Sequence, residues 1–76
     1  MPQKNYDSKV LKYLLEVGGR ALRKNIEREL NIPKSSLTYV QKRLASKGLI
    51  KVLHTFQNRL YWEITLEGKV FYQYGG

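Results

Sequence analysis

The 76-residue sequence contains no cysteine. Disulfide bonds and thiolate metal sites are therefore excluded, and a chain of this size has to be stabilised by its hydrophobic core alone. Hydrophobic residues make up 42% of the sequence, which is sufficient for a globular fold. Because the chain is short, we expect a single domain over residues 1–76.

Side chains that catalyse reactions or bind metals are also scarce. His54 is the single histidine, Asp7 is the single aspartate, and the glutamates are scattered along the chain. A catalytic triad or a metal site requires several such groups to converge, and no glycine-rich phosphate loop follows a predicted strand. We therefore expect neither enzymatic activity nor a bound metal or cofactor.

Long apolar segments are absent. No run of the sequence approaches the roughly 20 apolar residues that a membrane-spanning helix requires. The first residues are polar and lack the apolar stretch of a signal peptide. We therefore expect a cytoplasmic protein with no membrane partner.

Acidic residues are few and unevenly placed. The chain has 14 Lys and Arg against 6 Asp and Glu, for a formal net charge of +8. No acidic residue occurs between Glu29 and Glu63, where the cations are Lys34, Lys42, Arg43, Lys47, Lys51 and Arg59. This composition is expected of a surface that binds phosphates, because phosphates repel carboxylates and cations bound to them release counterions. Nucleic acid is the favoured partner; an anionic membrane surface and a merely basic protein are the alternatives.

The hydrophobic pattern predicts an α+β fold that is mostly helical. Apolar residues at spacings of three and four indicate helices over residues 8–17, 23–30 and 33–46. Arg20–Leu22 is expected to be a short extended link. Residues 49–64 alternate between apolar and polar, which is typical of a β-hairpin packed on the helices through one face.

Three residues mark the connections between these elements. Asn31 tolerates positive φ and Pro33 suits the first turn of a helix, so the second and third helices are expected to form a helix-turn-helix. Thr65 is a suitable cap for a short last helix. The residues of this helix that we expect to pack inward are Val70, Phe71 and Tyr74.

One face of the predicted helix 33–46 carries hydroxyls, an aromatic ring and cations. The stripe Leu37, Val40 and Leu44 is apolar and faces the core, so the polar side chains face solvent. Short hydroxyls can donate or accept at base edges in the major groove. The candidate base contacts are Ser35, Ser36, Thr38 and Tyr39, with the alternative that Tyr39 covers a neighbouring helix. The candidate phosphate contacts are Lys34, Lys42, Arg43 and Lys47.

The hairpin tip, residues 54–60, is a second candidate contact. A guanidinium is favoured in the minor groove by its negative potential, and Arg59 is placed for this at the tip, beside Asn58 and Gln57. The alternative is that Arg59 is a solvated charge in a turn.

The segment "NIERELNIPKSSLTYVQKRLASKGLI", followed by a hairpin and "WEITLEGK", resembles the winged helix-turn-helix domain of prokaryotic transcriptional regulators. The resemblance is closest to the compact MarR/ArsR/PadR-like types of archaea and archaeal viruses. It implies that residues 33–46 are a DNA recognition helix and that residues 55–59 are the tip of a wing. Glu27 departs from the pattern, because the family usually has a small residue there. The long C-terminal dimerisation helix and effector domain of larger regulators are not seen, so no small-molecule effector is expected.

These observations predict a sequence-specific regulator that binds double-stranded DNA. A winged-helix protein-docking module and a non-specific chromatin-like binder of nucleic acid are the alternatives. Since palindromic DNA sites mirror two-fold symmetry, we expect a homodimer. The residues expected to pair are Tyr6, Tyr13, Phe71, Tyr72 and Tyr74, with the alternative that these aromatics complete a small core.

Overall fold

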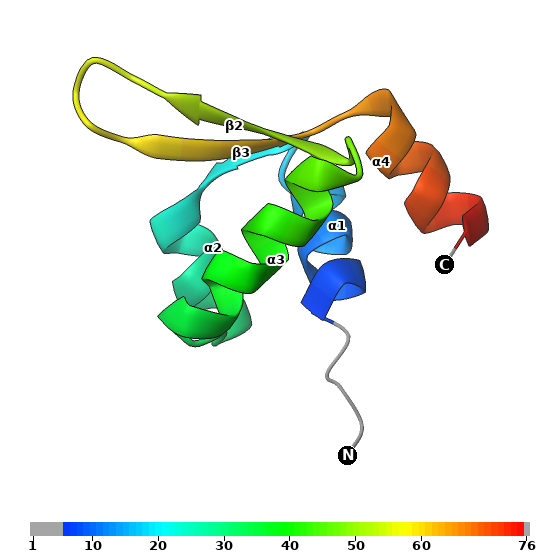
Figure 1. Cartoon of the computed structure of the whole chain (residues 1–76), viewed down its shortest axis with the longest axis horizontal. Coiled ribbons are helices and arrows are strands. Elements are labelled where there is room, and N and C mark those ends of the chain that lie inside the picture. The colour runs from blue at the N-terminus through cyan, green and yellow to red at the C-terminus, as the bar shows by residue number, and fades with distance from the viewer. Residues whose placement is uncertain (1–5, 76) are drawn as a thin grey trace.

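The computed structural model describes residues 6–75 and has the architecture of a winged helix-turn-helix (Figure 1). Helices predominate, and the predicted α+β class is confirmed. The elements in chain order are α1 (Tyr6–Glu16), β1 (Arg20–Leu22), α2 (Arg23–Leu30), α3 (Lys34–Ser46), β2 (Ile50–His54), β3 (Leu60–Ile64) and α4 (Leu66–Val70), which continues as one π-helical turn, η1 (Phe71–Gly75).

The sheet has three antiparallel strands in the order β1-β3-β2. Arg20–Leu22, which we expected to be an extended link, is a strand paired with β3. The hairpin is therefore joined through β3 to the segment between α1 and α2. The central residue of β3 is Trp62, which lies opposite Ala21 in β1 and Val52 in β2. The link was missed because three residues are too few to show the alternation of a strand.

The helix-turn-helix forms as the residues at the turn predict. Asn31 adopts the left-handed conformation (φ 55°, ψ 47°) that ends α2, and Ile32 is buried in the core. Pro33 precedes the first residue of α3, and its carbonyl accepts a hydrogen bond from the Leu37 N–H at 2.9 Å. The missing N–H of proline costs nothing there, because the first amides of a helix have no intrahelical partner.

The core lies between the helices and one face of the sheet. Trp62 is fully buried at its centre. The predicted stripe of α3 is buried, and so are Val10, Leu11 and Leu14 of α1. The buried hydrophobic residues are Val10, Leu11, Leu14, Ile26, Ile32, Leu37, Val40, Leu44, Leu49, Ile50, Trp62 and Ile64.

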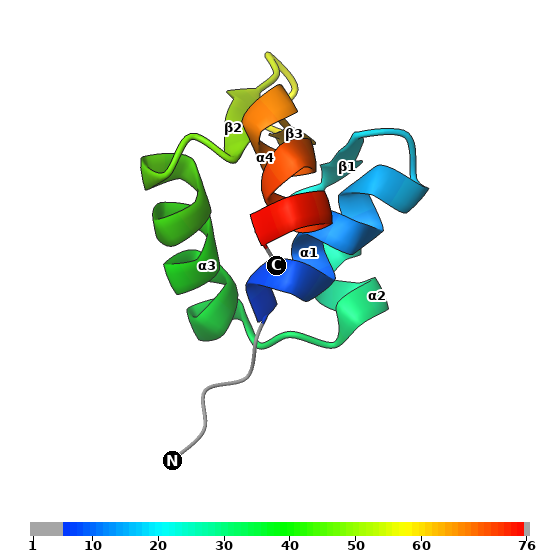
Figure 2. The same ribbon diagram turned by 90° about the vertical axis from the view of Figure 1, so that its right-hand side faces the viewer.

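The last helix contacts α1 and lies on the side of the molecule that faces the viewer in Figure 2. Thr65 caps α4 as predicted: its hydroxyl accepts a hydrogen bond from the Gly68 N–H at 2.9 Å and donates one to the Gly48 carbonyl at 2.7 Å. The inward packing predicted for Val70 and Tyr74 is wrong, since both are exposed, whereas Phe71 is half-buried against the core.

None of the helices within residues 6–75 is long and apolar enough to cross a membrane.

Gly68 is the position at which α4 approaches the body most closely. A Cβ there would press against the Leu49 carbonyl and lie 2.7 Å from Ile64 Cγ1. We expect Gly68→Ala to destabilise the protein by about 1–3 kcal/mol, which lowers the Tm by roughly 4–20 °C for a domain of this size. Thermal unfolding measures this, with the exposed Lys69→Ala as the control; equal Tm values for the two variants would contradict the close packing.

Candidate nucleic-acid interface

The solvent-facing side of α3 presents one row of polar side chains. Ser35, Tyr39, Lys42 and Ser46 follow one another at spacings of three and four, and all four are exposed. Tyr39 is 70% exposed, so its ring does not cover a neighbouring helix. Within the described part of the chain, none of these four side chains makes a hydrogen bond or an ion pair. The row is therefore free to meet an external partner.

Arg23, at the start of α2, bonds to the flank of α3 that faces α2. Its guanidinium donates to Thr38 Oγ1 at 3.0 Å, to Gln41 Oε1 at 3.3 Å and to the Lys34 carbonyl at 3.4 Å. The Thr38 hydroxyl in turn donates to the Lys34 carbonyl at 3.1 Å. Thr38 thus joins α2 to α3, and a base contact by its hydroxyl would have to displace these bonds. The role of Arg23 could not be predicted from the sequence, because its hydrogen-bond partners lie 11–18 residues away along the chain.

Arg43 on the opposite flank of α3 forms a two-pronged ion pair with Asp7 of α1. Nε and Nη2 donate to the two carboxylate oxygens at 2.9 and 2.7 Å. The hydrogen bond to Asp7 raises the pKa of Arg43 above its usual value. The acid-free interval of the sequence therefore does not fold into an acid-free surface, because Asp7 of another helix lies beside it. Arg43 is engaged within the protein, and the support for it as a phosphate contact is weakened.

The remaining predicted residues of α3 lie at its edges. Ser36 is half-buried on the side of Arg43. Lys34 is in the first turn, whereas Lys47 follows the last, about 20 Å away along the axis. Lys47 Nζ lies 6.0 Å from the centroid of the Phe71 ring, above the closing turn. Lys34 and Lys47 are not brought together.

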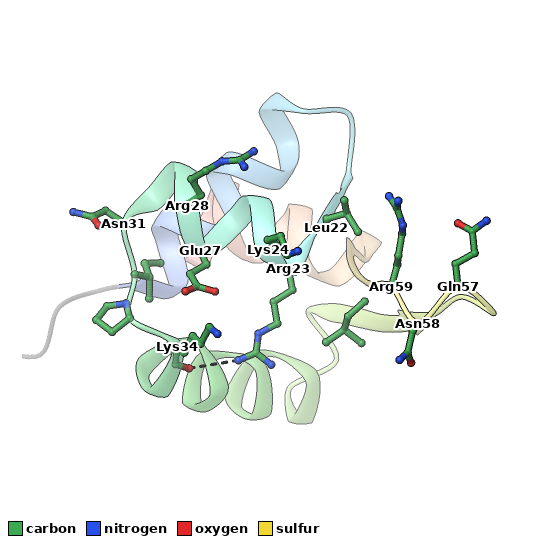
Figure 3. A pocket seen from close by; sticks show the side chains of 13 residues that line it. Leu22, Arg23, Lys24, Glu27, Arg28, Asn31, Lys34, Gln57, Asn58 and Arg59 are labelled. Atoms are coloured by element: carbon green, nitrogen blue, oxygen red, sulfur yellow. Dashed lines mark hydrogen bonds between the residues drawn. The ribbon is translucent and has the colours of Figure 1, made fainter.

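The wing turn is closed by hydrogen bonds between its two ends. The Thr55 N–H donates to the Arg59 carbonyl at 3.0 Å, and the Arg59 N–H donates to Thr55 Oγ1 at 3.2 Å. Asn58 adopts positive φ, 63°. Gln57, Asn58 and Arg59 are all exposed; Gln57 and Arg59 extend to one side of the turn and Asn58 to the other (Figure 3).

Phe56, next to these residues, is 98% exposed and is not among the residues predicted from the sequence to contact DNA. An aromatic residue in an otherwise polar turn is the one signal that could have found it. Nothing in the described chain packs against this ring, so it is presented to solvent at the tip of the wing.

A groove of about 1240 Å³ separates α2 and the start of α3 from the wing. We call it the α2–wing groove. It brings Lys34 and Arg59 to one concave surface and leaves Lys42 and Lys47 outside it. Its lining residues are Leu22, Arg23, Lys24, Glu27, Arg28, Asn31, Ile32, Pro33, Lys34, Gln57, Asn58, Arg59 and Leu60 (Figure 3).

The predicted pairing residues divide into two groups. Tyr6, Tyr13, Phe71 and Tyr72 are half-buried and pack against the core of their own chain. Tyr74 is 83% exposed and lies with Leu66 and Val70 along a shallow apolar hollow of about 550 Å³ on the last helix. The alternative that aromatics complete the core thus holds for the first group, and Tyr74 remains available for pairing.

The fold is that of known winged-helix regulators, although no family model matches the sequence and no curated protein matches it either. The PcaV transcriptional regulator from Streptomyces coelicolor superposes with a TM-score of 0.83 at 20% identity over 93% of this chain. The zinc-responsive MarR family member ZitR from Lactococcus lactis gives 0.77 at 17% over 96%. This chain spans 51% of the length of each.

A transcriptional regulator from Clostridium thermocellum gives a TM-score of 0.70 at 28% identity, over 88% of this chain and 74% of that protein. The common element of these structures is the winged helix-turn-helix. The fold of this chain is therefore a MarR-like winged helix-turn-helix.

Proposed function

We propose that this protein is a sequence-specific, double-stranded DNA-binding transcriptional regulator of the cytoplasm. The observation that carries the proposal is the exposed row on α3, in which Ser35, Tyr39 and Lys42 face solvent with no partner among the described residues. An α-helix fits the major groove of B-DNA. The similar folds of regulators such as PcaV support the same role.

In this proposal α3 enters the major groove and the wing contacts the minor groove or the backbone. Ser35 and Tyr39 are the best placed for base edges, while Ser36 and Thr38 lie at the margins of the row. Lys42 continues the row toward flanking phosphates. Further phosphate contacts are assigned to Lys34 and Lys47, with Arg43 the weakest candidate. The wing contributes Arg59, Asn58 and Gln57. The archaeal or viral origin suggested by the sequence stays a prediction.

Titration of labelled duplex DNA tests the proposal against its alternatives. We expect the affinity for a mixed-sequence duplex to fall steeply between about 50 and about 200 mM salt, because phosphate contacts release counterions. Selection from a random pool should then return one preferred sequence. A docking module would ignore DNA at every salt concentration, and a chromatin-like binder would show the salt dependence without the preference.

Lys42 and Arg43 form a matched pair for mutation. We expect Lys42→Gln to weaken binding to all duplexes by a similar factor and to reduce the salt slope by about 0.9. Arg43→Gln should change the DNA affinity less, because its charge is held by Asp7, and should instead lower stability by at most about 1 kcal/mol. Anisotropy and thermal unfolding measure the two effects; a larger loss of affinity for Arg43→Gln would reverse the assignment.

We further propose that the protein is a homodimer whose contact includes Leu66, Val70 and Tyr74. Leu66 is 72% exposed, and the three side chains share the outer face of the last helix with the exposed edge of Phe71. Apolar patches of this kind mark interaction surfaces more often than isolated apolar residues do. Two-fold pairing of identical patches is the commonest arrangement of soluble oligomers.

Sedimentation equilibrium at micromolar concentration measures the assembly. We expect a species of twice the 8.9 kDa chain mass, and we expect the double variant Val70→Ser with Tyr74→Ser to be monomeric, since burying the new hydroxyls removes the apolar gain. Tyr39→Ser removes an equally exposed aromatic from α3 and should leave the dimer intact. A wild-type monomer would rule out the proposed pairing.

A further inference from the structure

The α2–wing groove is lined mainly by cations. Arg23, Lys24, Lys34 and Arg59 contribute positive charge to it, and within residues 6–75 none of the four forms an ion pair. Arg28 also lines the groove, but it points away from α3 (Figure 3) and pairs with Glu29 at 3.8 Å. The groove is thus a concave surface with unneutralised positive charge, and its charge is complementary to a polyanion.

Glu27 is the single carboxylate in the lining of the groove. Its side chain extends from α2 toward the start of α3, between Arg23 and Lys34 (Figure 3). In the described chain this carboxylate makes neither an ion pair nor a side-chain hydrogen bond. Arg23 is not available to it, because the guanidinium is bonded to α3. The negative charge of Glu27 therefore acts on whatever enters the groove.

The position of the groove indicates what occupies it. It lies between the start of α3 and the tip of the wing, the elements proposed to contact adjacent grooves of DNA. The major and minor grooves of a duplex are separated by one sugar-phosphate backbone. A strand read on one side by α3 and on the other by the wing has to pass between them.

We propose that the α2–wing groove holds the backbone of one DNA strand, with Lys24 as an added phosphate contact and Glu27 as a repulsive charge that lowers the affinity for every duplex. The inference rests on the proposed function. Phosphate attraction supplies essentially all of non-specific binding, and a chain with net charge +8 is prone to it. A carboxylate against the backbone limits this attraction without contacting a base.

Replacement of Glu27 by its neutral isostere tests the repulsion. We expect Glu27→Gln to bind a short mixed-sequence duplex about fivefold more tightly at low salt, as removing one like charge near a phosphate in a solvated groove should. The gain should shrink as salt rises. Glu16→Gln is the control: it makes the same charge change at an exposed residue of α1 that neither lines the groove nor forms an ion pair within residues 6–75, and it should change the affinity by less than about twofold.

Lys24 tests the attraction in the same groove. We expect Lys24→Gln to weaken binding to all duplexes and to reduce the salt slope by about 0.9, the value for one lost phosphate contact. Lys12→Gln removes an exposed lysine of α1 that does not line the groove and should leave the slope unchanged. Thermal unfolding checks that the variants are folded; Glu27→Ala is a second neutral variant if Glu27→Gln is not.

The outcomes separate the two proposals. Equal gains for Glu27→Gln and Glu16→Gln would be an effect of net charge and would overturn the groove assignment, as would equal slopes for Lys24→Gln and Lys12→Gln. In both cases DNA binding that still depends on Lys42 would leave the proposed function standing. A wild-type protein that binds no duplex would overturn the function and the groove together.

Discussion

The fold depends on the burial of Trp62 in the central strand of the sheet. Its ring is fully buried among the helices, and its strand, β3, pairs with β1 on one edge and β2 on the other. Removing a buried aromatic side chain of this size generally costs about 3–5 kcal/mol, a large share of the stability of a small domain. The strand β3 therefore holds the other two strands together and, through Trp62, packs the sheet against the helices.

The orientation of α3 follows from this arrangement. Its apolar stripe packs on the core, Arg23 bonds to one flank and Asp7 bonds to Arg43 on the other. These contacts fix the rotation of α3 about its axis, so that the row containing Ser35 and Tyr39 faces solvent. Because the wing belongs to the same sheet as β1, the row and the wing are attached to one common core. Elements that are already ordered lose less entropy when they bind a partner.

Local features were predictable because their causes are local. The positive φ of Asn31, the cap at Thr65 and the spacing of Leu37, Val40 and Leu44 each depend on residues a few positions apart. Two expectations failed where the cause was distant. Arg20–Leu22 becomes a strand only because β3 is beside it, and Tyr74 stays exposed because the closing turn packs on the core through Phe71 and Tyr72 instead.

The sequence by itself determined the helix-turn-helix, the hairpin and the face of α3 that is polar, because periodicity and turn chemistry act over short distances. Only the tertiary structure decided which charges surround that face. Asp7 and Glu27 lie outside the acid-free interval between Glu29 and Glu63, yet folding brings Asp7 to Arg43 and Glu27 to the α2–wing groove. Electrostatic interactions depend on separation in space, and separation along the chain does not reveal it.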